Sequence, residues 1–502
     1  MFKNQNDESS QLTSMPWDEK PSLYDHIRAH IPPAGPGLTE DGETLPDEER
    51  VNSGSRVRWA PGAMDGIATH HMAGGDSDGR VARTVDLVRT YCSKPTAKNK
   101  ADLYRDIVKE KTVSLIDQVI EGITSHDDLN HQRLYELAHL FVTEATDREP
   151  TKFGIAILGL FVVAGNEDLF QTLGRHDDFT LFCAVALANS VQPPDQALWK
   201  LAKNVDGWGR IHVVERLSQT DDADIKAWLL RDGYRNNVMY EYLAYTCATA
   251  GGLLSAISTE QVDRELLTSA GEIIQALISG GPAECMDDYG DGALVTAKFL
   301  QHMEHQAEHV DDFLHVHTIQ RYLTDDEADW GARAESGWND ALRVEMLHQC
   351  VAILDRPTWV PLVGKQLVSD EDKSFFAANQ AADILGIPTW DHHWRRWNKQ
   401  RSDAARWFQV VQGIDDERLP VVLRAATEWI DLKAIATGPS DELGFGPGFE
   451  HHTCLDHLLR ELGRFPGEGE EFIEAGLSSP VVRNRKLAVA ALSCWATDRR
   501  QG

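Results

Sequence analysis

A recurring unit of two short helices joined by a tight polar turn constrains the fold of this chain more than any other feature. Residues 174–250 and residues 472–495 follow this pattern, although they lie far apart in the sequence. Each predicted helix carries a narrow apolar stripe, which a single helix pair leaves partly exposed to water. Covering that stripe requires the next pair along the chain, so the pattern predicts a layered, all-α molecule.

Helical periodicity continues through almost all of the chain from residue 81. Apolar residues recur at helical intervals over residues 103–123 and again over residues 134–141,. Strand signals are scarce, because no stretch alternates β-branched and polar residues. The Asp-Gly pairs at 206–207 and 232–233 lie between helical patterns, where glycine ends one helix and Asp or Asn starts the next. The helices predicted around these turns are residues 179–188, 197–205, 208–217, 223–230 and 238–248.

One C-terminal stretch resembles a HEAT repeat. Residues 479–484 read Ser-Pro-Val-Val-Arg-Asn, and residues 487–492 form a helix rich in small side chains. First-helix positions recur upstream at Phe179, Ile211 and Val238, at spacings that are short and irregular for such repeats. The resemblance implies a HEAT/armadillo-like helical repeat stack, an α-solenoid, over residues 81–496. HEAT-like families mostly serve as scaffolds and adaptors, and a few are enzymes.

The first 80 residues differ in composition from the rest. Six of the chain's 20 prolines lie within residues 1–60, and residues 35–50 are acidic and poor in large apolar side chains. This composition predicts a flexible acidic arm over residues 1–56, with room for one short docked helix around Trp17, Tyr24 and Ile27. A glycine-rich entry segment follows at residues 57–80, where dense glycines indicate turns or close backbone packing.

The charge of the chain restricts its partners. Asp and Glu number 79 against 49 Lys and Arg, which gives a formal net charge of −30 at pH 7. Such a chain repels nucleic-acid phosphates and anionic lipid headgroups unless its bases gather locally. The densest basic stretch, residues 392–406, is interrupted by tryptophan and aspartate. We therefore expect neither a nucleic acid nor a membrane as partner, and favour a protein partner with a basic surface or segment.

Cysteine usage and hydropathy predict a cytoplasmic protein, and the HEAT-like resemblance is to a bacterial type. The seven cysteines are odd in number and contain no CxxC pair, which is typical of reduced, buried thiols,. The N-terminus lacks the apolar core of a signal peptide. The longest uncharged apolar run covers residues 153–165, whereas a membrane-spanning helix needs about 20 residues.

The polar turns of the repeat-like region hold the densest mixture of aromatic and charged residues. Trp, Tyr and Arg dominate the energetics of protein interfaces, and turns of consecutive repeats lie along one edge of a stack. This arrangement predicts a non-catalytic scaffold that binds a protein along its turns. The alternative is structural, with the aromatic residues joining adjacent helix pairs and the charged ones pairing locally. The candidate binding residues are Trp208, Arg210, His212, Glu215, Tyr234, Arg235, Asn236 and Glu241.

An enzyme with a pocket at the glycine-rich segment is the alternative function. Asp65, His70 and His71 would supply its acid–base chemistry as a hydrolase or lyase, with or without a metal ion,. No phosphate-binding loop, dinucleotide fingerprint or nucleophile elbow accompanies them. The sequence therefore favours binding over catalysis.

A second alternative concerns a metal site. His302, His305 and His309 are spaced at i, i+3 and i+7, so one continuous helix would place them on a shared face that suits zinc,. The His-Glu-x-x-His spacing of zinc proteases is absent, and a solvated helix face explains the same residues. No cofactor is predicted.

Overall fold

The computed structural model describes residues 20–51, 53, 61–62, 78–126, 128–446 and 448–498. Over these residues the chain contains helices and turns, with one isolated bridge between Glu442 and Val481 in place of any β-strand. The predicted all-α class is therefore confirmed. The chain divides into a first unit, residues 1–307 with 315–353, and a second unit, residues 308–314 with 354–502.

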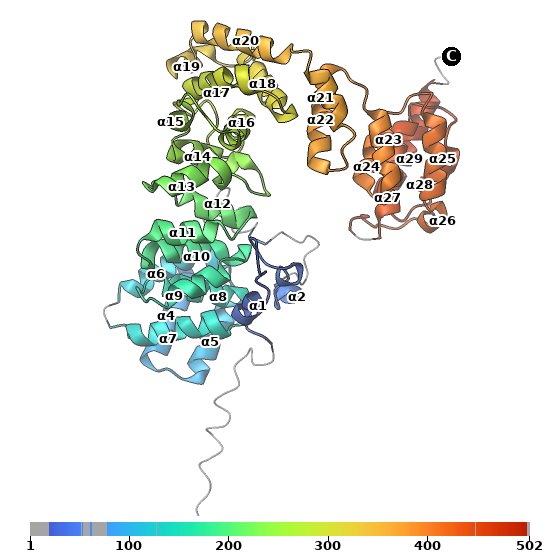
Figure 1. Ribbon diagram of the computed structural model, residues 1–502. Coiled ribbons are helices and arrows are strands. Elements are labelled where there is room, and N and C mark those ends of the chain that lie inside the picture. The colour runs from blue at the N-terminus through green and yellow to red at the C-terminus, as the bar shows by residue number, and fades with distance from the viewer. Residues whose placement is uncertain are drawn as a thin grey trace, which may run out of the picture. The chain divides into compact units, whose positions relative to one another are not determined.

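Short helices make up the N-terminal part of the first unit, coloured blue to teal in Figure 1. They are α1 Leu23–Ala29, η1 Glu40–Gly42, α2 Glu48–Val51, α4 Asp78–Ser93, α5 Ala97–Ile107, η2 Thr112–Ser114, α6 Ile116–Thr124, α7 His131–Glu144, α8 Arg148–Leu158, α9 Asn166–Leu173, α10 Asp177–Ser190 and α11 Pro194–Ala202. Side-chain caps set several of their starts. Asn130 Oδ1, for example, accepts a hydrogen bond of 3.0 Å from Arg133 N and so satisfies a free donor at the start of α7,.

The chain continues through a second series of helices. They are α12 Gly207–Glu215, α13 Ala223–Trp228, the π-helical turn η3 Leu229–Gly233, η4 Tyr240–Tyr242, α14 Ala244–Gly251, α15 Leu253–Ile257, α16 Arg264–Ser279, α17 Gly292–Gln306, α18 Val310–Leu323, α19 Trp330–Glu335 and α20 Asp340–Leu354. Most of the predicted helices of the repeat-like region are present here. The last one starts later than predicted, because a turn capped by Asn236 delays α14 until Ala244.

Helices of the first unit pack mainly against helices close to them in the sequence. The contacts run from α7 to α8, from α8 to α10, from α10 to α12, from α12 to α14 and from α14 to α16 (Figure 1). Most residues of α8, α10 and α12 are buried, so these helices are covered on most sides and do not show the narrow apolar stripe that the sequence predicted,.

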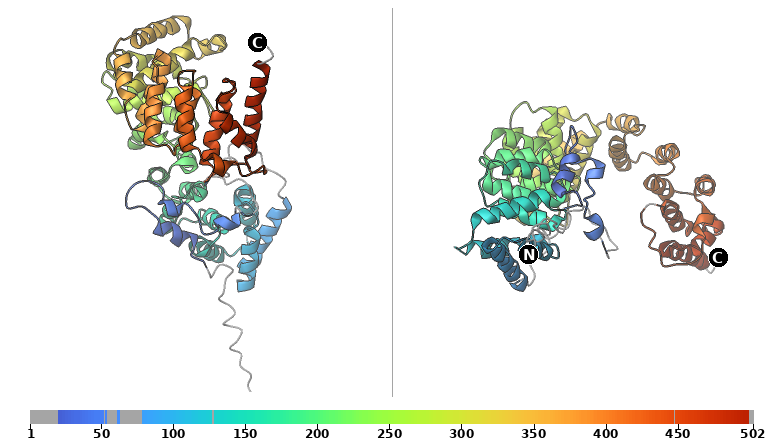
Figure 2. Two further views of the ribbon diagram at one scale, coloured as in Figure 1. Left: turned by 90° about the vertical axis from the view of Figure 1, so that its right-hand side faces the viewer. Right: turned by 90° about the horizontal axis from the view of Figure 1, so that it is seen from below.

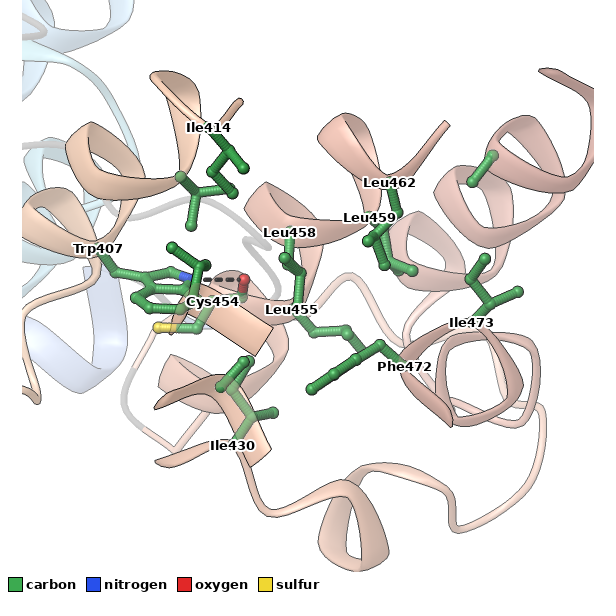
Figure 3. Close-up of a cluster of buried hydrophobic side chains, with 14 of the residues drawn as sticks. Trp407, Ile414, Ile430, Cys454, Leu455, Leu458, Leu459, Leu462, Phe472 and Ile473 are labelled. Atoms are coloured by element: carbon green, nitrogen blue, oxygen red, sulfur yellow. Dashed lines mark hydrogen bonds between the residues drawn. The ribbon is translucent and has the colours of Figure 1, made fainter. Parts of the chain in front are cut away.

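The second unit has its own core, which connects helices α23 to α29. Its helices are α21 Trp359–Gln366, α22 Asp372–Leu385, α23 Trp390–Lys399, α24 Ala404–Gln412, α25 Leu419–Trp429, α26 Leu432–Ile435, α27 Glu450–Leu462, α28 Glu470–Leu477 and α29 Val482–Asp498. Trp407 is fully buried, and its Nε1 donates a hydrogen bond of 2.9 Å to Cys454 O (Figure 3). Leu455 and Leu458 of α27 continue this core toward Phe472 of α28 (Figure 3). The last helix, dark red in Figure 2, packs against α27 and α28.

The described part of the expected flexible arm is docked on the first unit instead. The short helix expected around Tyr24 and Ile27 is α1, in which Leu23 and Ile27 are fully buried. The Leu23 amide donates a hydrogen bond of 2.9 Å to Ala145 O. Residues 20–51 are therefore part of the folded unit, although their composition resembles that of a solvated segment.

Buried charges explain this docking. The Arg148 guanidinium donates to Asp47 at 3.0 Å, to Glu48 at 2.7 Å and to Asp178 at 2.5 Å, and Asp47 is only 1% exposed. Burial acts to raise the pKa of Asp178, but the neighbouring cations, with Lys152 foremost among them, lower it to about 2. The acidic residues of the segment thus neutralise a buried arginine that lies about 100 residues further along the chain.

The seven cysteines are all free, and five of them are buried, as their apolar neighbours indicated. In the part of the chain that the structure describes, no helix has both the length and the apolar character needed to cross a bilayer. These observations agree with the sequence but do not identify a compartment.

Replacing Arg148 by alanine tests the importance of the buried network. The change removes the buried guanidinium that hydrogen-bonds to both Asp47 and Asp178, so we expect the free energy of unfolding of the first unit to fall by about 3–5 kcal/mol in urea titrations. Arg80→Ala is the matched control, because Arg80 also pairs with a carboxylate, that of Glu110, but its side chain is 51% exposed. This control should cost less than about 1 kcal/mol. Equal losses in the two variants would contradict the account.

Candidate functional site

The starts of α10 and α12 meet the turn before α14 at one edge of the first unit. Asp206 Oδ1 accepts hydrogen bonds from Gly207 N at 2.7 Å and from Asn237 N at 3.0 Å, which joins the second of these segments to the third. A Cβ added at Gly207 would lie 2.7 Å from Asp177 Oδ2 and 3.0 Å from Asn237 Oδ1. We call residues 177–178, 206–210 and 232–241 together the turn edge.

Two glycines make this close approach possible. Gly207 has a φ of +57°, a left-handed conformation that favours glycine,. Gly209 lies in the first turn of α12, and a Cβ there would lie 2.6 Å from both Asp177 Oδ1 and Thr180 Oγ1. The Asp177 carboxyl group therefore rests directly against the backbone of α12, where the backbone amides at a helix start favour an acidic neighbour.

The glycine-rich segment reaches the same edge through its described residues. Gly62 N donates a hydrogen bond of 2.9 Å to Asp178 Oδ1. A Cβ at Gly62, whose φ is +70°, would come within 2.9 Å of Asp177 O. The two regions that the sequence offered as separate candidate sites therefore meet at the start of α10. Asp65, His70 and His71 lie outside the described residues.

Arg210 and Asp232 link the start of α12 to the π-helical turn η3. The guanidinium of Arg210 is buried, pairs with Asp232 at 2.5 Å and lies 5.2 Å from the ring centroid of Trp228. The π-helical turn η3 places Asp232, whose side chain is 47% exposed. Such turns are rare and occur often at functional sites. Arg210 therefore holds the edge together, while the carboxylate of Asp232 faces solvent.

Tyr234, Arg235 and Asn236 fix the second part. Tyr234 is buried and its hydroxyl donates to Glu272, which also accepts from Arg235 Nε at 3.0 Å. Asn236 Oδ1 accepts from Val238 N at 2.9 Å and from Met239 N at 2.8 Å. The polar groups of Tyr234 and Asn236 thus bond to other residues of the first unit. Both residues therefore act in the fold itself, which was the structural alternative to binding a partner.

The remaining predicted binding residues divide by exposure. His212 is buried, with its ring 6.5 Å from that of Trp208. Trp208 itself is half-buried and makes an edge-to-face contact of 5.0 Å with Tyr242,. Glu215 is also half-buried, and burial together with the nearby Glu284 raises its pKa to about 7.

Glu241 is half-buried and its Cβ lies beside Gly281. Of the eight predicted binding residues, Trp208, Glu215, Arg235 and Glu241 are thus partly exposed and the other four are buried. The sequence did not single out Asp177, because nothing in the periodicity of α10 shows that Asp177 faces other carboxyl groups. The available signal was the Asp-Asp pair that directly precedes the predicted helix over residues 179–188.

Asp177 is the most perturbed carboxyl group of the edge. Burial is the main cause that raises its pKa well above the usual value, and the carboxylates of Glu43, Asp178 and Asp206 act in the same direction. A hydrogen bond from the Gly209 backbone opposes them. Asp177 and Asp178, although adjacent, thus have pKa values shifted in opposite directions.

The three histidines considered for zinc are not on one helix. Helix α17 ends at Gln306, so His309 lies beyond the helix that carries His302 and His305. His302 Nε2 is 2.8 Å from Ile257 O, so a backbone carbonyl occupies its ring nitrogen. Within the described ranges, no three His, Cys, Asp or Glu side chains gather as a metal site requires.

Comparison with known proteins does not add a family. No protein-family model, no curated protein and no solved structure matches the chain. The function must therefore be inferred from the geometry of the turn edge.

Asp177→Asn tests whether the Asp177 carboxylate is destabilised by burial and by the other carboxylates at the turn edge. Because folding raises the pKa of Asp177, the native state loses stability as the pH rises from the unfolded pKa, about 4, through the native pKa. We therefore expect the variant to have a higher Tm than the parent at pH 8, and this gain to shrink as the pH falls toward 4. Thermal unfolding at a series of pH values provides the measurement.

Asp178→Asn is the adjacent control, with the opposite sign. Folding lowers the pKa of Asp178 to about 2, so its charged form stabilises the native state above the unfolded pKa,. This variant should have a lower Tm at neutral pH, and the deficit should shrink as the pH falls from about 4 toward 2. If both variants lowered Tm at pH 8, the assignment of Asp177 would be wrong.

Proposed function

We propose that the first unit is a HEAT-like helical stack and that the protein is a non-catalytic scaffold which binds a protein partner along the turn edge. Packing between helices close in the sequence supports the stack. So do arginine–carboxylate pairs that join one layer to the next, such as Arg210–Asp232 at 2.5 Å and Arg231–Asp263 at 2.6 Å. HEAT repeats of this kind build extended surfaces from turns that vary independently.

One observation carries the binding proposal: partly exposed aromatic residues on the turn edge pack against buried tyrosines. Trp208 packs edge-to-face on Tyr242 at 5.0 Å, and Tyr240 packs edge-to-face on Tyr234 at 5.4 Å. Tyr234 is in turn fixed by Glu272. Rigid aromatic side chains lose little conformational entropy when a partner covers them, so they favour binding.

The charge of the edge indicates the chemistry of the partner. Asp206, Asp232 and Glu241 are partly exposed around the aromatic residues. The partner we propose therefore presents a basic segment, with Lys or Arg next to apolar groups. The chain's net charge of −30 disfavours nucleic acid and anionic lipid at this surface,. A cytoplasmic location, consistent with free thiols, belongs to the same proposal,.

Truncating Trp208 tests this proposal. A partner is first isolated by affinity capture and purified, and its Kd for the full chain is measured by calorimetry. Trp208→Ala and Tyr240→Ala should each weaken binding about tenfold or more, as the loss of an interface anchor does. Phe376→Ala, which removes a side chain that is 52% exposed in the second unit, is the control and should leave the Kd unchanged. Unchanged binding in both edge variants would refute the proposal.

A hydrolase or lyase is the second candidate, and the opposite pKa shifts of Asp177 and Asp178 beside Gly62 favour it. Pairs of carboxyl groups shifted apart in this way are typical of acid–base sites. Asp65→Ala combined with His70→Ala separates the two functions. The scaffold proposal requires that this double variant keeps its affinity for the partner. Turnover of a metabolite that is lost in the double variant would instead establish the enzyme.

A further inference from the structure

The second unit contains a groove between its last two helices, α28 and α29. One wall comes from one face of α28, where residues 470, 473, 474 and 477 follow helical spacing, and the other comes from Leu492, Trp495 and Ala496 of α29,. The groove encloses about 580 Å³. In Figure 2 these helices are the red and dark red ones at the C-terminal end of the chain.

The floor of the groove is rigid and its rims are apolar. Ile473 and Trp495 are buried, and Trp495 Nε1 donates a hydrogen bond of 2.7 Å to Leu462 O, which fixes the indole. Leu477 and Leu492 stand on the two walls with 37% and 38% of their surfaces exposed. Two parallel apolar rims over a fixed aromatic floor match the space that one amphipathic helix fills.

Acidic side chains accompany this apolar surface. Glu470 and Glu474 line the groove and are exposed, and Glu471 lies beside them on the first turn of α28. We propose that the groove binds an amphipathic helix of a partner protein. The apolar side chains of that helix would pack on Leu477 and Leu492, and its lysine or arginine side chains would lie beside Glu470 and Glu474. The occupant is basic because the groove carries carboxylates at its edge.

The same charges argue against two other occupants. A second copy of the chain would bring its own Glu470 and Glu474 against these residues, and like charges in contact are costly. An anionic lipid surface would be repelled for the same reason. The proposal uses only residues of the second unit, so it stands or fails separately from binding at the turn edge.

A designed peptide tests the groove directly. The probe is a fluorescein-labelled helix of about 15 residues, long enough to be helical when bound, with leucine at i, i+3, i+4 and i+7 and lysine beside this stripe. Fluorescence anisotropy with the full chain gives its Kd. The lysine peptide should bind at least tenfold more tightly than a version with glutamate in place of lysine.

Variants of the chain locate the binding. Glu470→Lys with Glu474→Lys, and separately Leu492→Asp, should each weaken the lysine peptide at least tenfold. Asp416→Lys with Glu417→Lys makes the same change in net charge at exposed residues outside the groove, and it should change the Kd less than threefold. Circular dichroism and Tm checks that each variant is folded, and Leu492→Ser replaces Leu492→Asp if the latter is not.

Three results would overturn the proposal. Equal weakening by the two double reversals would show attraction to the whole acidic chain and not to the groove. Full binding by the folded Leu492 variants would place the peptide elsewhere. Sedimentation that shows a dimer of the chain, lost on substitution of Leu492, would assign the groove to a second copy.

Discussion

The contact of Asp177 with the backbone of α12 is the constraint on which the turn edge depends. It requires that no Cβ stands at Gly207 or Gly209, because one there would lie 2.6–2.7 Å from an Asp177 oxygen. This contact places the start of α10 against the start of α12, and Asp206 then joins α12 to the turn at Asn237. The aromatic residues proposed to bind a partner take their positions from these three segments.

Electrostatics explains both the cohesion of the first unit and its local strain. Arg148 pairs with Asp47, Glu48 and Asp178, so its buried charge has carboxylate partners on several sides,. Asp177 has carboxylates as its charged neighbours and keeps a raised pKa. Strongly shifted carboxyl groups often occur at functional sites, which is a further reason to propose the turn edge as the site of function.

The sequence predicted local structure well and long-range contacts poorly. Runs of apolar residues located α10, α11 and α12, because most side chains of α10 and α12 and one face of α11 are buried. Composition could not reveal that residues 20–51 dock, since the partner of Asp47 is Arg148, about 100 residues away. Likewise, residue types marked Arg210 and Tyr234 as interface residues, but could not show that both are buried in the first unit and paired there with Asp232 and Glu272.

The most direct test of the central contact is the stability of Gly209→Ala. Alanine favours a helix over glycine by about 1 kcal/mol, so the variant should gain stability if nothing opposes the new methyl group. We predict a loss in urea unfolding instead, because the methyl group would meet Asp177 and Thr180 at 2.6 Å. Gly364→Ala in α21, where nothing lies within 4 Å of the added carbon, should show the ordinary gain. A Gly209→Ala chain that is as stable as the parent, or more stable, would contradict the account.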